Sequence, residues 1–125
     1  MDPKETVKEL KRRYKEAPKE AGIFRITNTA NGKIYLGSSL NLHGPLNKHR
    51  FVLATGAHIT KALQADWNRH GEAAFVFEIV EQVKPSDDPG FNVADELELL
   101  EQIWIEKERP FSERGYNEGK TIRES

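Results

Sequence analysis

Cysteine is absent from this chain of 125 residues, which excludes disulfide frameworks, thiol catalysis and thiolate zinc sites and agrees with a reducing compartment. Long hydrophobic runs are also missing, because no stretch approaches 18 apolar residues. The first twenty residues are too charged for the apolar segment of a signal peptide. We therefore expect neither a membrane span nor export. With 37% apolar and 31% charged residues, the composition is typical of a soluble globular protein.

Several common catalytic motifs are lacking as well. The sequence has no glycine-rich phosphate loop, no HExxH zinc motif and no serine-centred nucleophile elbow. Internal repeats and low-complexity tracts are absent too. The length fits one domain, which we place at residues 21–125, preceded by a charged helix within residues 1–20.

The charge is distributed unevenly along the chain. Residues 21–72 carry six basic and two acidic groups together with all four histidines, whereas residues 73–125 carry six basic and thirteen acidic groups. A basic middle third suits a surface that faces phosphates. Packing of two oppositely charged halves would explain the same asymmetry, so charge alone leaves both interpretations open.

The pattern of apolar residues predicts an α+β fold. Two β-rich runs, 23–27 and 33–37, are joined through Asn31-Gly32, which is a strong hairpin signal. Helices are expected at about 45–55, 59–70 and 93–108, and a third strand at 75–81. Asp2 as cap and Pro3 in the first turn predict an additional N-terminal helix that ends before Pro18. The tail from residue 111 is expected to be mostly irregular.

Two polar side chains fall where apolar ones are expected. His49 lies between two leucines on the inner face of its predicted helix, and Glu101 flanks the apolar stripe of the last helix. A carboxylate in that position needs a partner, a metal ion or solvent. Taken singly, each has an ordinary explanation: a satisfied core histidine and a glutamate that reaches water. Tyr35 and Asn117 are likewise an ordinary strand aromatic and an ordinary turn residue.

The order of the motifs, however, resembles the signature of the GIY-YIG nuclease family. Gly22-Ile23-Phe24 is followed eleven residues later by Tyr35-Leu36-Gly37, across an Asn-Gly-Lys turn. The likeness continues through further segments in the same order: Ser38-Ser39, His49, His58, Lys61-x-Leu63-Gln64, Trp67-Asn68, Gly71, Phe75-x-Phe77-Glu78-Ile79, Glu101, Trp104-Ile105 and Gly115-Tyr116-Asn117. It covers about residues 21–118 and is nearest to the catalytic domains of phage-type homing endonucleases.

The resemblance implies a fold, an activity and a set of site residues. The family has a small three-stranded antiparallel sheet flanked by helices, and its members cut DNA phosphodiesters with one divalent metal ion, here Mg²⁺ or Mn²⁺. By position, Glu101 would be the metal ligand and Tyr35 would lie near the attacking water. His49 would orient groups or relay protons, Asn117 would support the site, and His58 matches a histidine of homing members.

DNA is the partner that the resemblance implies, in an intracellular, DNA-associated protein. The candidate DNA contacts are five side chains of the basic middle third: Arg25, Lys33, Lys48, Arg50 and His58. Phage-type homing enzymes carry a separate DNA-binding region after this domain. We therefore expect a partner protein or an additional region to supply sequence specificity.

Two positions depart from the family pattern. Phe24 stands where the first signature tyrosine is expected, and Pro45 stands where the family has an arginine. A guanidinium that holds the phosphate is worth several kcal/mol by the usual scale, and proline supplies none of it. Lys48, Arg50 and His43 are near in sequence and are candidates to replace it.

Three hypotheses about function therefore remain. The first is a metal-dependent DNA endonuclease or nickase with reduced activity, which the retained Glu101 and His49 favour. The second is a catalytically silent DNA-binding or regulatory module that keeps the fold, which Phe24 and Pro45 favour. The third is a protein-interaction domain that uses the acidic C-terminal third.

Overall fold

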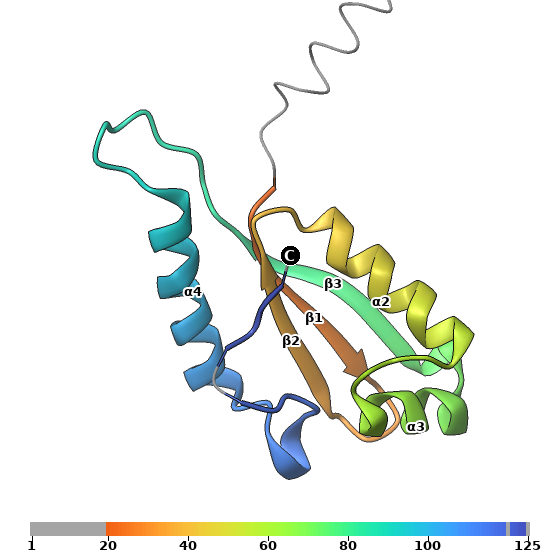
Figure 1. Cartoon of the computed structure of the whole chain (residues 1–125). Coiled ribbons are helices and arrows are strands. Elements are labelled where there is room, and N and C mark those ends of the chain that lie inside the picture. The colour runs from red at the N-terminus through yellow and green to blue at the C-terminus, as the bar shows by residue number, and fades with distance from the viewer. Residues whose placement is uncertain (1–19, 120, 125) are drawn as a thin grey trace, which may run out of the picture.

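The computed structural model describes residues 20–119 and 121–124, so the predicted helix at residues 2–17 lies outside the described residues. The described helices lie around a small sheet (Figure 1). In chain order the elements are β1 (Gly22–Asn28), β2 (Ile34–Ser39), α2 (His43–Thr55), α3 (Lys61–His70), the 3₁₀ turn η1 (Glu72–Ala74), β3 (Phe75–Gln82), α4 (Val93–Glu108), the 3₁₀ turn η2 (Ser112–Arg114) and β4 (Arg123–Glu124).

The sheet has four strands in the order β3-β1-β2-β4. Strand β1 pairs antiparallel with β2 and with β3, whereas β4 pairs parallel with β2. The predicted α+β class is therefore confirmed, but the expected three-stranded antiparallel sheet is instead a four-stranded mixed one. The fourth strand falls in the tail that was predicted to be irregular, and two residues are too few to show a strand period.

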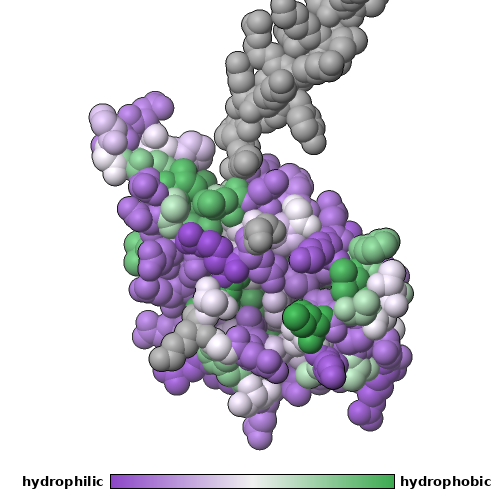
Figure 2. Space-filling model, viewed as in Figure 1, coloured by the Kyte–Doolittle hydropathy of each residue, from purple (hydrophilic) through white to green (hydrophobic). Residues whose placement is uncertain are grey.

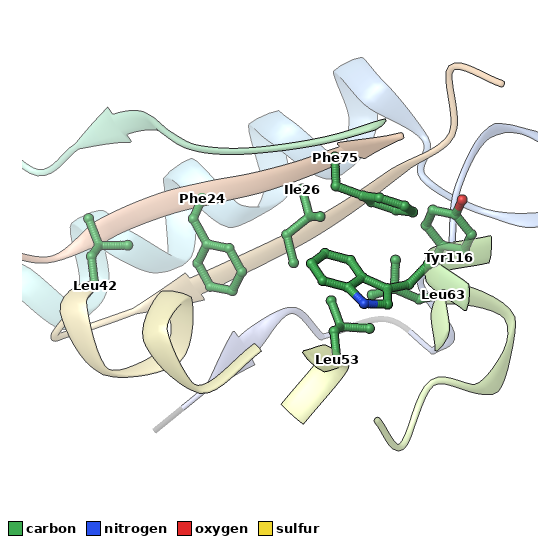
Figure 3. Packing of buried hydrophobic residues seen from close by; sticks show 8 residues of the cluster. Phe24, Ile26, Leu42, Leu53, Leu63, Phe75 and Tyr116 are labelled. Atoms are coloured by element: carbon green, nitrogen blue, oxygen red, sulfur yellow. The ribbon is translucent and has the colours of Figure 1, made fainter. Parts of the chain in front are cut away.

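Alternation along β1 sends neighbouring side chains into two separate cores. Phe24 and Ile26 face α2 and α3, where they pack with Leu53 and other buried residues (Figure 3). Ile23 faces α4 and packs with Leu97 in the second cluster. The sheet is thus covered by α2 and α3 on one face and by α4 on the other (Figure 1).

The helix ends follow local chemistry. Helix α2 begins at His43, two residues earlier than predicted, because Pro45 still lies in the first turn, where its missing N–H leaves no intrahelical bond unmade. It ends at Gly56, which adopts the left-handed conformation with φ 80°. Helix α3 begins at Lys61, two residues later than predicted, because Thr60 is still extended.

Gly37 is required by the close approach of a neighbouring ring. A Cβ atom built on Gly37 would lie 2.1 Å from Cζ of Phe24, which is completely buried. Gly44, in the first turn of α2, has no atom within 4 Å of an added Cβ. A methyl group would therefore collide with Phe24 at position 37 but would meet no other atom at position 44.

We predict that Gly37→Ala lowers the free energy of unfolding by about 1–3 kcal/mol, because the new methyl group overpacks the core against Phe24. Gly44→Ala is the matched control, and there we expect a gain of about 0.5 kcal/mol from better helix propensity. Urea unfolding of the three chains measures both effects. Equal stabilities for the two variants would show that the ring can move away at no cost.

Candidate active site

A pocket of about 460 Å³ opens beside strand β2, on the side of the sheet that α2 covers. Its lining residues are Tyr35, Pro45, Lys48, His49, Val52, Ala57, His58, Ile59, Arg123 and Glu124. The ring centroids of Tyr35 and His49 are 5.1 Å apart, and those of His49 and His58 are 5.0 Å apart in a stacked arrangement. Three of the residues predicted from the sequence are therefore brought together.

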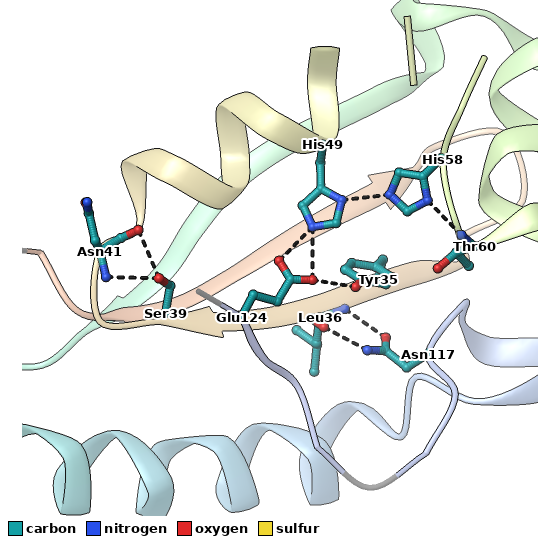
Figure 4. A network of polar contacts seen from close by, with 9 residues as sticks. All are labelled: Tyr35, Leu36, Ser39, Asn41, His49, His58, Thr60, Asn117 and Glu124. Atoms are coloured by element: carbon teal, nitrogen blue, oxygen red, sulfur yellow. Dashed lines mark hydrogen bonds and ion pairs between the residues drawn. The ribbon is translucent and has the colours of Figure 1, made fainter. Parts of the chain in front are cut away.

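The two imidazoles form a hydrogen-bonded chain that starts at a backbone amide (Figure 4). The N–H of Thr60 donates to Nδ1 of His58 at 3.0 Å, and Nε2 of His58 lies 2.7 Å from Nδ1 of His49. Because an amide N–H can only donate, the proton of neutral His58 must be on Nε2, which then donates to His49. Neutral His49 therefore carries its own proton on Nε2, pointing into the pocket.

Burial keeps His58 neutral. Desolvation, and after it the nearby His49, lower the pKa of His58 to about 4, against the opposing effect of Glu124. The backbone N–H of His58 is itself held by Oε1 of Gln64 at 3.0 Å. His58 is thus fixed in place as a neutral donor to His49, rather than as a charged group that faces the pocket.

Glu124 is a site residue that sequence reasoning missed. Its carboxylate accepts a hydrogen bond from the Tyr35 hydroxyl at 2.6 Å and lies 2.7 Å from Nε2 of His49 (Figure 4). Burial alone would raise the pKa of Glu124, but the hydrogen bonds from His49 and Tyr35 and the nearby positive charge outweigh it, so the net shift is downward. Burial and the adjacent carboxylate raise the pKa of Tyr35 far above 10, so this phenol stays protonated.

Glu101 lies on the opposite side of the same strand edge. It is buried on α4, and its Oε1 accepts from Nε of Arg123 at 2.8 Å and from Nη2 at 2.5 Å. Glu101 does not line the pocket, yet its partner Arg123 does. The carboxylate that the sequence placed beside an apolar stripe therefore has a cationic partner in addition to its small solvent exposure.

Asn117 supports strand β2 rather than lining the pocket. Its Oδ1 accepts from the backbone N–H of Leu36 at 2.8 Å, and its Nδ2 donates to the Leu36 carbonyl at 2.7 Å. The two bonds replace those that a neighbouring strand would make, and they fix the backbone of Leu36, which follows Tyr35 in β2. Asn117 therefore holds the backbone of β2 beside Tyr35, and its role in the site stays a prediction.

The predicted DNA contacts separate into two groups. Lys48 and His58 line the pocket. Arg25 instead pairs with carboxylates of β3 and α4, at 2.8 Å and 2.9 Å. Lys33 and Arg50 lie over aromatic rings, with 5.8 Å and 4.7 Å to the ring centroids. The structure does not bring Arg25, Lys33 or Arg50 to the pocket.

One of the two departures from the family pattern, Pro45, lines the pocket. The other, Phe24, is buried behind it, with its ring centroid 5.5 Å from that of His49. His43, one of the candidates to replace the arginine, is exposed and pairs with Glu20. Among the described residues, the arginine and the lysine that line the pocket are Arg123 and Lys48, and the guanidinium of Arg123 is bound to Glu101.

A metal ion at this site would have to be shared with a substrate, because the described residues offer few ligands. Within residues 20–119 and 121–124 there is no cluster of three or more His, Asp or Glu side chains that could hold an ion. Glu101 is a single carboxylate, and Mg²⁺ commonly binds through one or two carboxylates together with substrate phosphates and water. The buried hydroxyl of Ser38, also on β2, has no hydrogen-bond partner among the described residues.

The face of the molecule shown in Figure 2 is mainly hydrophilic, with separate apolar areas. No helix in the described part of the chain is both long enough and apolar enough to span a membrane.

Comparison with known proteins confirms the likeness found in the motifs. Residues 20–117 match the GIY-YIG catalytic domain. The chain belongs to the GIY-YIG family. Intron-associated endonuclease 1 of Enterobacteria phage T4 is 32% identical over 98 residues, which are 78% of this chain and 36% of that protein. This GIY-YIG chain therefore spans about a third of the length of that relative.

Solved structures agree with this GIY-YIG assignment. The catalytic domain of homing endonuclease I-TevI superimposes with a TM-score of 0.62 at 29% identity, covering 79% of this chain and 98% of that one. A mutant of the same catalytic domain gives a TM-score of 0.62 at 27% identity and covers 84% of this chain and 99% of that one.

The low pKa of His58 predicts that acid destabilises this GIY-YIG domain. In the unfolded chain the histidine takes up a proton near pH 6.5, but in the folded chain only near pH 4. The free energy of unfolding therefore falls as the pH drops from 6.5 to 4, because the unfolded state binds more protons there. Urea unfolding across this range should show a shallower pH dependence for His58→Gln than for the wild type. The control is His70→Gln at an exposed position, and a wild-type slope in His58→Gln would refute this account.

Proposed function

We propose that this chain is the catalytic domain of a metal-dependent DNA endonuclease or nickase, and that the edge of β2 is its active site. One observation carries the proposal: in a GIY-YIG domain, a phenol and two linked imidazoles lie on one side of this edge, and a lone buried carboxylate lies on the other. Phosphodiester hydrolysis requires donors for the phosphate and a carboxylate for the cation, and both kinds of group are present.

His49 would act as a hydrogen-bond donor to the phosphate. Because His58 occupies the lone pair on Nδ1 of His49, the Nε2–H of His49 points into the pocket, where the Glu124 carboxylate accepts it in this structure. A fixed donor that faces developing negative charge stabilises the transition state without reorganisation. The phenol of Tyr35, protonated and in the same pocket, would orient the attacking water.

Glu101 would hold the divalent cation, Mg²⁺ or Mn²⁺. When bound, such an ion neutralises charge on the phosphate and lowers the pKa of a bound water. In this structure the guanidinium of Arg123 is bound to Oε1 of Glu101. It would therefore have to leave the carboxylate before a cation could bind there.

Lys48 would contact the phosphate in place of the missing arginine. It lines the pocket, whereas the other two sequence candidates, Arg50 and His43, have partners elsewhere. A lysine supplies a point charge but no planar bidentate fork. We therefore propose reduced activity relative to a family member that retains the arginine.

Sequence specificity would come from outside this domain. The chain spans about a third of the T4 intron-associated endonuclease, and most of the basic side chains predicted to contact DNA have partners within the fold. An additional DNA-binding region or a partner protein would therefore direct the cut.

A second candidate function is a DNA-binding or regulatory module without catalysis. Two observations favour this silent module. Phe24 and Pro45 replace the family tyrosine and arginine, and the carboxylate of Glu101 is already bound by an arginine. The two candidates differ in one property, the cleavage of DNA in the presence of a divalent metal ion.

We predict that the full chain nicks supercoiled plasmid with Mg²⁺ or Mn²⁺, and that Glu101→Gln lowers the rate by about 100-fold or more, because the cation loses its carboxylate. Glu98→Gln changes an exposed glutamate of the same helix and should leave the rate unchanged. Gel assays at several metal concentrations measure both. Binding of DNA without cleavage at any metal concentration would instead support the silent module.

We also predict that Lys48→Met lowers the nicking rate at saturating DNA by about tenfold, since a cation beside the phosphate stabilises developing charge. Lys61→Met removes an exposed lysine that does not line the pocket and controls for general electrostatic attraction. Single-turnover rates separate catalysis from affinity. Equal rates for both variants would remove Lys48 from the proposed site.

A further inference from the structure

Residues 121–124, here called the edge segment, lie along the outer edge of β2 and run between the two halves of the site. The carbonyl of Ile122 accepts from the N–H of Ser38 at 2.8 Å, and Ile122 packs in the core beneath α4. Arg123 and Glu124 then pair in parallel with Ser38 and Ser39. In Figure 1 the C-terminal trace passes between α4 and α2.

Consecutive residues of the edge segment reach opposite sides of the sheet, as strand geometry requires. Arg123 turns toward α4 and binds the carboxylate of Glu101, while Glu124 turns toward α2 and binds the side chains of His49 and Tyr35. One dipeptide therefore contacts both halves of the site at the same time.

The two side chains of this dipeptide carry the same signs of charge as the proposed ligands of the site, a phosphate and a metal ion. The Glu124 carboxylate is an anion that accepts from the phenol and the imidazole N–H, the two groups proposed to face a phosphate and its attacking water. The Arg123 guanidinium is a cation on the carboxylate proposed to hold a metal ion. The exposed fractions are 25% for the Glu124 side chain and 10% for that of Glu101, so solvent screens these contacts only in part.

We propose that the edge segment is an intramolecular inhibitor of this site, in which Glu124 occupies the position of the DNA phosphate and Arg123 that of the divalent cation. This inference rests on the proposed nuclease function. Metal ion and DNA backbone bind only after the edge segment leaves β2. Because Arg123 and Glu124 are neighbours in sequence, displacing one loosens the other, so metal and DNA each favour binding of the other.

The edge segment is held to β2 weakly enough to be released reversibly, because the stronger contacts lie upstream of it. Upstream, Asn117 holds Leu36 through two hydrogen bonds, and Tyr116 N–H donates to the Ile34 carbonyl at 2.8 Å. The edge segment itself pairs with β2 at only two residues. Release therefore leaves the supported part of β2, including Tyr35, in place.

The test uses point variants of the full chain and two binding measurements. Mn²⁺ binding without DNA is followed by electron paramagnetic resonance of the free ion, for wild type, Arg123→Gln and the exposed control Arg114→Gln. Binding of a short fluorescein-labelled duplex in EDTA is followed by anisotropy, for wild type, Glu124→Gln and the exposed control Glu118→Gln.

We expect Arg123→Gln to bind Mn²⁺ about fivefold or more tightly than its control, and Glu124→Gln to bind the duplex about fivefold or more tightly than its control. Unchanged affinity in either comparison overturns the proposal. If Arg123→Gln fails to fold, Arg123→Lys, which keeps the charge but loses the fork, should shift Mn²⁺ affinity in the same direction by a smaller factor, and no shift overturns the proposal.

Plasmid nicking by the same variants separates this inference from the proposed function. Gains in both affinities with no nicking by any chain would support the inhibitor and reject the nuclease. Nicking by the wild type with affinities equal to the controls would support the nuclease and reject the inhibitor.

Discussion

Strand β2 is the constraint on which the site depends. Its two faces are covered by different layers, α2 on one side and α4 on the other, so side chains from both layers approach one another across its edge. Asn117 fixes that edge by binding both backbone groups of Leu36. The position of Tyr35 follows directly, since it is the adjacent residue and points to the opposite face.

A single backbone amide sets the tautomers of the two histidines in the pocket. Thr60 N–H fixes the tautomer of His58, which fixes that of His49, and burial keeps His58 uncharged. In the sequence the two histidines are nine positions apart, and nothing there indicates that they are in contact. The loop between α2 and α3 turns His58 back against α2 and so forms the hydrogen bond between the two rings.

The sequence predicted the hairpin, the three described helices, the third strand, and the grouping of Tyr35, His49 and His58, because periodicity and ordered motifs report local structure and family membership. It missed Glu124 and Arg123, whose strand is too short for a period; the β-branched pair Thr121-Ile122 is the one local signal that could have indicated it. It also could not show that Arg25 is bound by carboxylates more than fifty positions away.

The uneven charge of the chain acquires a physical explanation from these contacts. The acidic C-terminal third packs against the basic middle third: β3 and α4 neutralise Arg25, and the tail places Glu124 beside His49. The two interpretations of the charge pattern are therefore linked, because the cationic surface is partly covered by the chain's own anions. On the proposed function, a DNA phosphate would compete with those internal carboxylates, and its affinity would depend on how readily they are released.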